Sequence, residues 1–155
     1  MRRNNQALTE EEIQAGLAHA TSGVLSLFGD DGYPYGVPMS YTEESGKIYF
    51  HSAVVGEKID AIKNNPKASF TIILQDEVFK ERFTTRYISL MFFGKVRFIL
   101  DENEKKRILG LFAEKYGIGD PKTAEEEVAN SLDHVAIISF TIEKATGKKS
   151  KYLVD

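Results

Sequence analysis

Short apolar segments separated by polar turns recur along most of this chain and give the clearest structural signal in its sequence. Runs of about four to eight apolar, β-branched and aromatic residues between clusters of Gly, Pro, Asn and Asp are typical of β-strands. The segment 86–100 is too long for one flat strand, so Gly94 within it predicts a bend or bulge. On this pattern we predict six strands, at residues 24–28, 35–41, 47–52, 67–74, 86–100 and 134–144.

Apolar residues at helical spacing predict further elements around the strands. Thr9 and Glu12 have the spacing of a capping box and begin the first helix, over about residues 9–20. The second helix runs from about Gly56 and ends before Pro66, because a residue that precedes proline avoids the helical region.

Two more helices are predicted between the fifth and sixth strands. Asp101 caps the first of them, and its buried face is expected to contain Ile108, Leu111 and Phe112. The glycine-rich stretch 117–121 breaks it, and a short helix follows near residues 124–132. The pattern does not assign residues 75–85, and residues 146–155 are expected to be a mostly polar tail.

The order of these elements indicates a mainly β (α+β) fold. The strands do not alternate with helices in βαβ units, which argues against a doubly wound parallel sheet. A small closed or partly closed antiparallel barrel with peripheral helices fits better. The 155 residues contain no repeat or linker and are expected to form one domain, residues 1–155.

Composition and charge limit the kinds of molecule that this chain is expected to bind and the compartments in which it is expected to occur. The net charge of −3 gives no general attraction to nucleic acid or to an anionic membrane, and no apolar run is long enough to span one. The positively charged start lacks the apolar core of a secretory signal. Because there is no cysteine, a disulfide framework, a thiolate nucleophile and a zinc–thiolate site are excluded, and a cytoplasmic location is the default expectation.

Sequence motifs exclude several enzyme classes. The chain has no Gly-x-Ser-x-Gly elbow, no Gly-x-Gly-x-x-Gly motif and no P-loop lysine motif. His19, His51 and His134 lack a second ligand at metal-binding spacing, so no metal site is expected.

The most informative stretch is the passage from the third predicted strand to the second helix. His51 and Ser52 end the strand, and Gly56 and Lys58 begin the helix. Free N–H groups at a helix N-terminus, the positive end of its dipole and a lysine together favour a phosphate. An ordinary strand-to-helix connection with a surface lysine is the other interpretation. Ser89, a lone hydroxyl in an apolar strand, either bonds a backbone carbonyl or faces a ligand.

The order and spacing of five segments resemble a known superfamily. They are YPYGVPMSY, GKIYFHSAVVGEKIDAI, NPKASFTI, FTTRYISLMFFGKVRFI and LDHVAIISFTIEKATGKKSK. Between Gln6 and Lys151 the chain resembles the pyridoxamine 5′-phosphate oxidase-related FMN-binding split-barrel superfamily, and most closely its nitroimidazole-resistance (Nim) flavoproteins. The segment IYFHSAVVGEKIDAI is the most specific part of this likeness.

The resemblance implies a homodimer of six-stranded, Greek-key split β-barrels with FMN at the subunit interface. It implies that one strand lies along the flavin ring through its backbone groups, namely Val37, Pro38, Met39 and Ser40. The residues expected to border the ribityl chain and phosphate are His51, Ser52 and Ala53, and those expected to complete the phosphate grip are Gly56 and Lys58. The hydroxyl of Ser89 is expected to be a further polar contact of the flavin.

The resemblance also implies an activity, the FMN-dependent reduction of small nitroaromatic compounds of the 5-nitroimidazole kind, with His51 contacting or protonating the substrate. A flavin-, deazaflavin- or haem-binding barrel without this turnover is one alternative. A pyridoxamine 5′-phosphate oxidase-like oxidase is another. That oxidase activity is disfavoured because the chain has no tryptophan, and because Lys58 is a single cation where those enzymes carry two.

Overall fold

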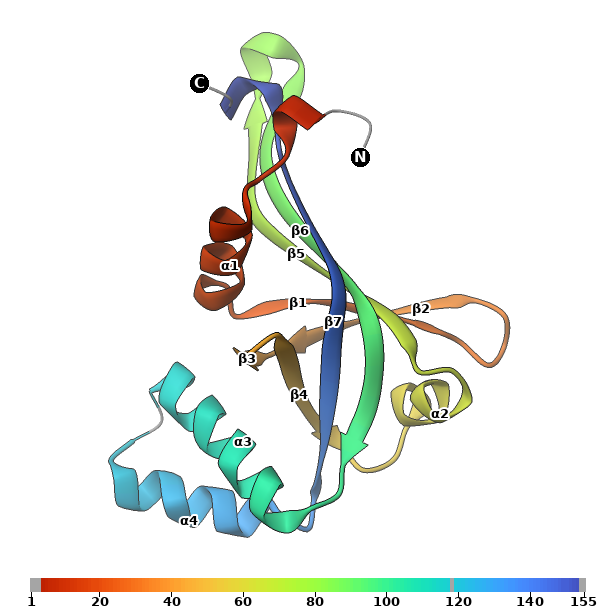
Figure 1. Cartoon of the computed structure of the whole chain (residues 1–155), viewed down its shortest axis with the longest axis vertical. Helices are drawn as coiled ribbons and strands as arrows, with labels where there is room; N and C mark the ends of the chain where they lie inside the picture. Colours follow the sequence, from red (N-terminus) through yellow and green to blue (C-terminus); the bar gives the residue numbers. More distant parts are fainter. Residues whose placement is uncertain (1–3, 118, 154–155) are drawn as a thin grey trace.

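The computed structural model describes residues 4–117 and 119–153 and shows one antiparallel sheet with peripheral helices (Figure 1). The seven strands have the order β2-β1-β5-β6-β7-β4-β3. They are β1 (Ser22–Phe28), β2 (Pro34–Ser40), β3 (Thr42–Glu44), β4 (Lys47–Ala53), β5 (Lys67–Phe79), β6 (Thr84–Ile99) and β7 (Val135–Lys149). The helices are α1 (Glu10–His19), α2 (Glu57–Asn64), α3 (Glu102–Tyr116) and α4 (Pro121–Ser131), with short 3-10 turns η1 (Asn4–Gln6), η2 (Lys80–Arg82) and η3 (Lys151–Leu153).

The sheet curls around a core of aromatic side chains. Phe70 on the interior strand β5 meets Tyr41, which follows β2, at 5.2 Å between ring centroids, and meets Phe50 on β4 at 5.0 Å. All three residues are fully buried. Because β2 lies at one edge of the sheet and β4 near the other, these contacts require that the two ends of the sheet curve toward each other. The mainly β, antiparallel prediction is therefore confirmed, although the strand order leaves the barrel unclosed by hydrogen bonds.

The bulge predicted at Gly94 is present. The pairing of β6 with β7 shifts by one residue between Phe93 and Gly94. A Cβ atom at Gly94 would lie 1.9 Å from the backbone oxygen of Thr141, so only glycine allows β7 to pass this closely.

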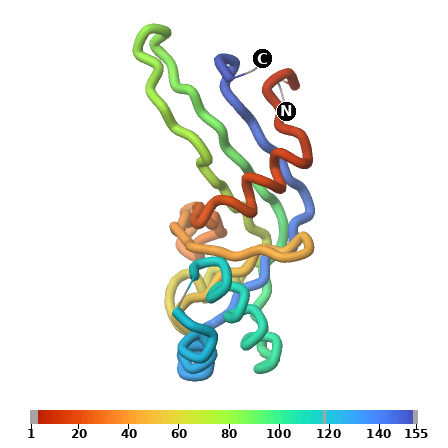
Figure 2. Tube along the Cα trace, turned by 90° about the vertical axis from the view of Figure 1, so that its left-hand side faces the viewer, coloured from red at the N-terminus to blue at the C-terminus, as the bar shows by residue number. Residues whose placement is uncertain are grey.

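Strand number and length differ from the prediction at three places. The short strand β3 lies between the second and third predicted strands, where no strand was predicted, and pairs with β4. The unassigned residues 75–85 form the end of a long β5–β6 hairpin, and the tail expected from residue 146 begins as the last part of β7. The β5–β6 hairpin end and the last part of β7 form an arm beyond the curled part of the sheet (Figure 2). In this arm polar residues occur on both faces, and the alternation that identifies a strand is lost.

The predicted helices are confirmed, with ends shifted by a few residues. The Thr9–Glu12 capping box is formed, and Asp101 accepts a hydrogen bond from the Glu104 N–H at the start of α3. Ile108 and Phe112 are buried as expected, and Leu111 is half-buried. In the described part of the chain, no helix combines the length and the apolar character needed to cross a membrane.

Candidate functional site

The turn from β4 to α2 contains four of the residues predicted to bind a ligand. His51 and Ser52 lie near the end of β4, Gly56 is the N-cap of α2, and Lys58 lies in its first turn. Gly56 has φ 136° and ψ 174°, a backbone conformation that strongly favours glycine. The sequence therefore brings its candidate anion-binding residues to one corner, which we name the β4–α2 corner.

The N-terminus of α2 is free to accept an anion. Among the described residues no side chain caps it. The Ile59 and Asp60 N–H groups donate to the Gly56 backbone oxygen, which leaves those of Glu57 and Lys58 at the positive end of the helix dipole. Lys58 is half-buried and adds a positive charge beside these groups. Glu57 and Asp60 lie in the same turn and offset part of this charge. The corner fits a phosphate group, which would be held by backbone donors and one lysine.

His51 lies beside Lys58 and against the helix α3. Its imidazole ring makes an edge-to-face contact with Phe112, with 4.8 Å between ring centroids and an interplanar angle of 77°. Partial burial, and next the nearby charge of Lys58, lower the pKa of His51 below 6.5. The imidazole is therefore neutral at pH 7, and it has one nitrogen that donates and one that accepts a hydrogen bond.

The neighbouring residues of β4 have less prominent roles. The Ser52 hydroxyl donates to the Ala53 backbone oxygen at 2.9 Å, so it is held by a local bond. Ala53 is exposed and pairs with Val135 on β7. In the part of the chain that is described, no group of three or more His, Cys, Asp or Glu side chains is arranged to hold a metal ion.

The predicted flavin-ring residues lie on the edge strand β2. Met39 is buried and Val37 half-buried, so these two side chains point into the core, whereas Pro38 and Ser40 are exposed. Within the part of the chain that the structure describes, β2 pairs with β1 along one edge, and the backbone groups of its other edge are left for a ligand. The contact of β2 with the flavin ring through backbone groups stays a prediction.

Ser89 is not near the β4–α2 corner of the same chain. It pairs with Lys148 on β7, while His51 pairs with Ile137 on the same strand. These positions on β7 are eleven residues apart (148 − 137), which is up to about 36 Å along a strand. Ser89 is half-buried on the arm, and one chain alone does not unite it with Lys58.

Two residues of α3 adjoin the site and were not among the predicted site residues. Phe112 contacts His51, and the Tyr116 hydroxyl lies 2.7 Å from the backbone oxygen of Tyr41, just after β2. The apolar spacing of α3 predicted that Phe112 is buried. It could not predict the contact with His51, because that contact depends on how the helix packs on the sheet.

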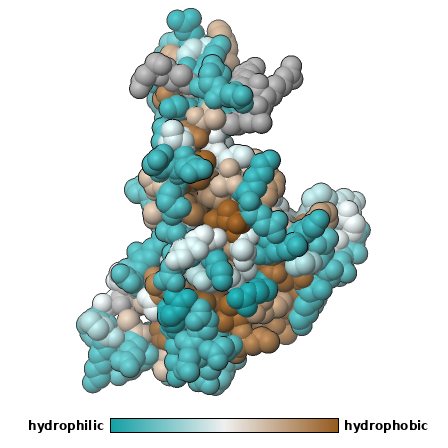
Figure 3. Space-filling model, viewed as in Figure 1, coloured by the Kyte–Doolittle hydropathy of each residue, from teal (hydrophilic) through white to brown (hydrophobic). Residues whose placement is uncertain are grey.

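Hydrophobic side chains are exposed on the outer face of the sheet. Paired positions on four neighbouring strands bring Pro38, Val24, Thr71 and Met91 into one row across it. Val24 and Met91 are each 39% exposed. Figure 3 shows hydrophobic residues reaching the surface near the middle of the molecule and along its lower part.

Comparison with known proteins assigns this chain to a family. The family model described as pyridoxamine 5′-phosphate oxidase matches residues 9–149. The chain therefore belongs to the pyridoxamine 5′-phosphate oxidase family. No curated protein sequence gives a significant match.

Solved structures agree with this assignment. A proposed 5-nitroimidazole antibiotic resistance protein from Bacteroides thetaiotaomicron VPI-5482 is 25% identical, with a TM-score of 0.79 over 92% of this chain and 86% of that one. The conserved hypothetical protein Rv2991 from Mycobacterium tuberculosis has a TM-score of 0.83 at 16% identity, over 97% of this chain and 91% of its own. The flavocytochrome Anf3 from Azotobacter vinelandii has a TM-score of 0.76 at 20% identity, over 94% of this chain and 70% of its own. The similarities to Rv2991 and Anf3, at 16% and 20% identity, show a shared fold and no more.

Proposed function

We propose that this protein is an FMN-dependent reductase of small nitroaromatic compounds, and that the phosphate of FMN binds at the β4–α2 corner. The observation that carries this proposal is that one corner combines His51, Lys58 and an uncapped helix N-terminus. The 25% identity to a proposed 5-nitroimidazole resistance protein supports the choice of substrate class.

The residues of the corner would neutralise the cofactor's phosphate. A phosphate monoester carries a charge of about −1.5 to −2 at neutral pH. The Lys58 ammonium group and the backbone N–H groups of α2 offset this charge, and the edge strand β2 offers backbone groups to the ring. When bound, FMN would supply the electron-transfer chemistry of the reaction.

His51 is suited to contact the substrate. In the free protein its pKa is lowered, so it is a hydrogen-bonding group and not a cation at neutral pH. A phosphate next to Lys58 would offset that lysine's charge, which is the smaller of the two causes of the lowered pKa of His51, and would raise that pKa in part. Cofactor binding would then increase the fraction of His51 that carries a proton to give to a reduced nitro group.

We further propose that the site is completed by a second copy of the chain. Ser89 lies too far from Lys58 within one chain, so a contact between Ser89 and the cofactor requires the arm of a partner subunit. The exposed apolar row through Val24 and Met91 gives such a partner a surface to pack on.

An oxidase acting on pyridoxamine 5′-phosphate is the second candidate, because the matching family model carries that description. The absence of tryptophan and the single lysine in the phosphate turn favour the reductase instead.

The test starts from protein purified without added cofactor. Mass spectrometry of the released ligand is expected to give FMN, and NAD(P)H is expected to bleach the flavin absorbance. Anaerobic addition of a 5-nitroimidazole should then restore the colour, whereas pyridoxamine 5′-phosphate should not be oxidised in air. Release of haem or FAD, or a reduced protein that a nitroimidazole leaves bleached, would contradict the proposal.

A further inference from the structure

Helix α3 contacts both strands that border the candidate site. On the β4 side, Phe112 packs against the His51 ring at 4.8 Å. On the β2 side, the Tyr116 hydroxyl oxygen lies 2.7 Å from the Tyr41 backbone oxygen and 2.8 Å from that of Thr21, and its hydrogen is donated to one or the other. Thr21 directly precedes β1, and Tyr41 directly follows Ser40 of β2.

The two contacts are joined within the helix. Phe112 and Tyr116 are four residues apart and therefore lie on one face of α3. Their rings are nearly parallel, with 6.2 Å between centroids and an interplanar angle of 11°. A chain of side-chain contacts thus leads from His51 on β4, through two stacked rings, to the backbone at the end of β2.

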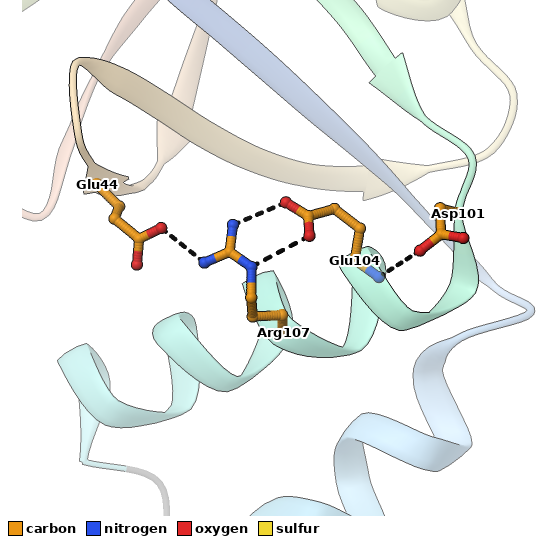
Figure 4. A network of polar contacts seen from close by, with 4 residues as sticks. All are labelled: Glu44, Asp101, Glu104 and Arg107. Carbon is orange, nitrogen blue, oxygen red and sulfur yellow. Dashed lines mark hydrogen bonds and ion pairs between the residues drawn. The ribbon is translucent and has the colours of Figure 1, made fainter.

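The helix is held in place without the Tyr116 hydroxyl. Asp101 caps its N-terminus, and Arg107 forms ion pairs with Glu104 of the same helix and with Glu44 of β3, at 2.7 and 2.6 Å (Figure 4). At the other end, the Lys115 ammonium group donates to the Ala20 backbone oxygen at 2.7 Å. Removal of one hydroxyl is therefore expected to change local geometry while the helix remains docked.

The ring of His51 can turn about its side-chain bonds unless neighbouring groups hold it. Phe112, which is 4% exposed and packed in a cluster with Ile108 and Ile137, forms a fixed wall beside the ring. Lys58 from α2 is the charged group that acts on His51, and the wall from α3 is apolar. The orientation of His51 therefore depends on where α3 places Phe112.

We propose that Tyr116 is a positioning residue: through its hydroxyl bond to the end of β2 and its stacking on Phe112, it fixes the orientation of His51 relative to β2. Helix α3 then holds β2 and β4 in fixed positions relative to each other. The consequence for cofactor binding rests on the proposed function, whereas the effect on His51 does not.

The test uses Tyr116→Phe, which removes only the hydroxyl, with Tyr33→Phe as matched control because Tyr33 is 74% exposed in the β1–β2 turn. The imidazole resonances of His51 in the cofactor-free protein are followed by NMR. In the wild type and in the control they should show the displacement that the ring current of Phe112 produces. In Tyr116→Phe they should move toward the values of a free histidine, and the pKa of His51 should rise.

Binding of FMN, measured by quenching of its fluorescence, is the second measurement. Tyr116→Phe is expected to weaken it by at most about 10-fold, because the lost hydrogen bond is internal to the protein and acts on binding only through the geometry of β2 and His51. If neither variant nor wild type binds FMN, the proposed function fails and the His51 resonances still decide the positioning role.

Phe112→Leu separates the two steps of the contact chain, since it keeps an apolar side chain and removes the ring. It should displace the His51 resonances as Tyr116→Phe does. If Phe112→Leu displaces them and Tyr116→Phe leaves them at their wild-type positions, Tyr116 has no positioning role and the proposal is overturned.

Discussion

At the scale of single residues, Lys58 is the main positive charge of the proposed phosphate site. Lys58→Ala should weaken FMN binding about 10- to 100-fold, because a hydrogen bond to a charged group contributes about 1.5–3 kcal/mol. The salt dependence of binding should also become shallower in this variant. Fluorescence titration at two salt concentrations measures both effects.

Lys63→Ala is the matched control for Lys58→Ala. Lys63 is an exposed lysine in the last turn of the same helix, away from its N-terminus. It should bind FMN as the wild type does. Equal dissociation constants for the two variants would remove the electrostatic basis of the β4–α2 corner.

His51 should give the free protein a pH-dependent stability. Burial and then Lys58 lower its folded-state pKa below 6.5, the value expected in the unfolded chain. As the pH falls from 7 through that value, the unfolded chain takes up a proton that the folded chain does not, so stability is lost. Below the folded-state pKa both states are protonated and the loss stops.

Urea unfolding of cofactor-free wild type and His51→Gln, at several pH values between about 7 and 5, measures this effect. The free energy of unfolding should fall more steeply with decreasing pH in the wild type than in His51→Gln. Parallel curves for the two proteins would show that the fold imposes no cost on protonation of His51.

At the scale of elements, the close approach of strands β6 and β7 depends on Gly94. Gly94→Ala places a Cβ atom 1.9 Å from the Thr141 backbone oxygen, and backbone cannot move aside as a side chain can. We expect a loss of about 3 kcal/mol in the free energy of unfolding, at the upper end for overpacking. Urea denaturation measures it.

Gly110→Ala is the control for this substitution. Gly110 lies within α3, is exposed, and has no atom within 4 Å of a Cβ built on it. Alanine should leave stability unchanged or raise it by up to about 1 kcal/mol, because it is the better helix former. A comparable loss in both variants would mean that close packing at Gly94 is not the cause.

Elements with local signals could be predicted from the sequence. The capping residues Thr9 and Asp101 placed two helix starts, and the β-branched and aromatic residues of 67–74 placed the first part of β5. The rest of β5 and the end of β7 were missed, because strands in the arm have polar residues on both faces. The short strand β3 was missed although its pairing is local: Glu44 pairs with Lys47 across the two-residue turn 45–46, and residues 43 and 44 were interpreted as part of that turn.

The candidate site was predictable to the extent that it is local in sequence. His51, Ser52, Gly56 and Lys58 lie within eight positions of each other, so a strand-to-helix turn was enough to bring them together. The contact of Phe112 with His51 joins residues that are far apart in sequence. No pattern in either segment specifies it.

At the scale of the whole molecule, the two ends of β7 carry different parts of the proposed site. The His51 end belongs to the barrel, and the Ser89 end belongs to the arm (Figure 1). The long arm makes a single chain poorly suited to surround a ligand at its own β4–α2 corner. Two chains whose arms reach across a shared apolar face would each complete the other's site.

Subunit complementation tests this arrangement. Lys58→Ala removes the phosphate lysine, and Ser89→Asp places a repelling carboxylate on the arm, so each variant alone should bind FMN weakly. When the two variants are mixed and allowed to exchange subunits, a mixed dimer has one site with an intact Lys58 from one chain and an intact Ser89 from the other. The mixture should therefore recover tight FMN binding at up to one site per mixed dimer, while sedimentation confirms dimers throughout. If Ser89 instead served the site of its own chain, every site in the mixture would carry one substitution, and binding would remain as weak as in the separate variants.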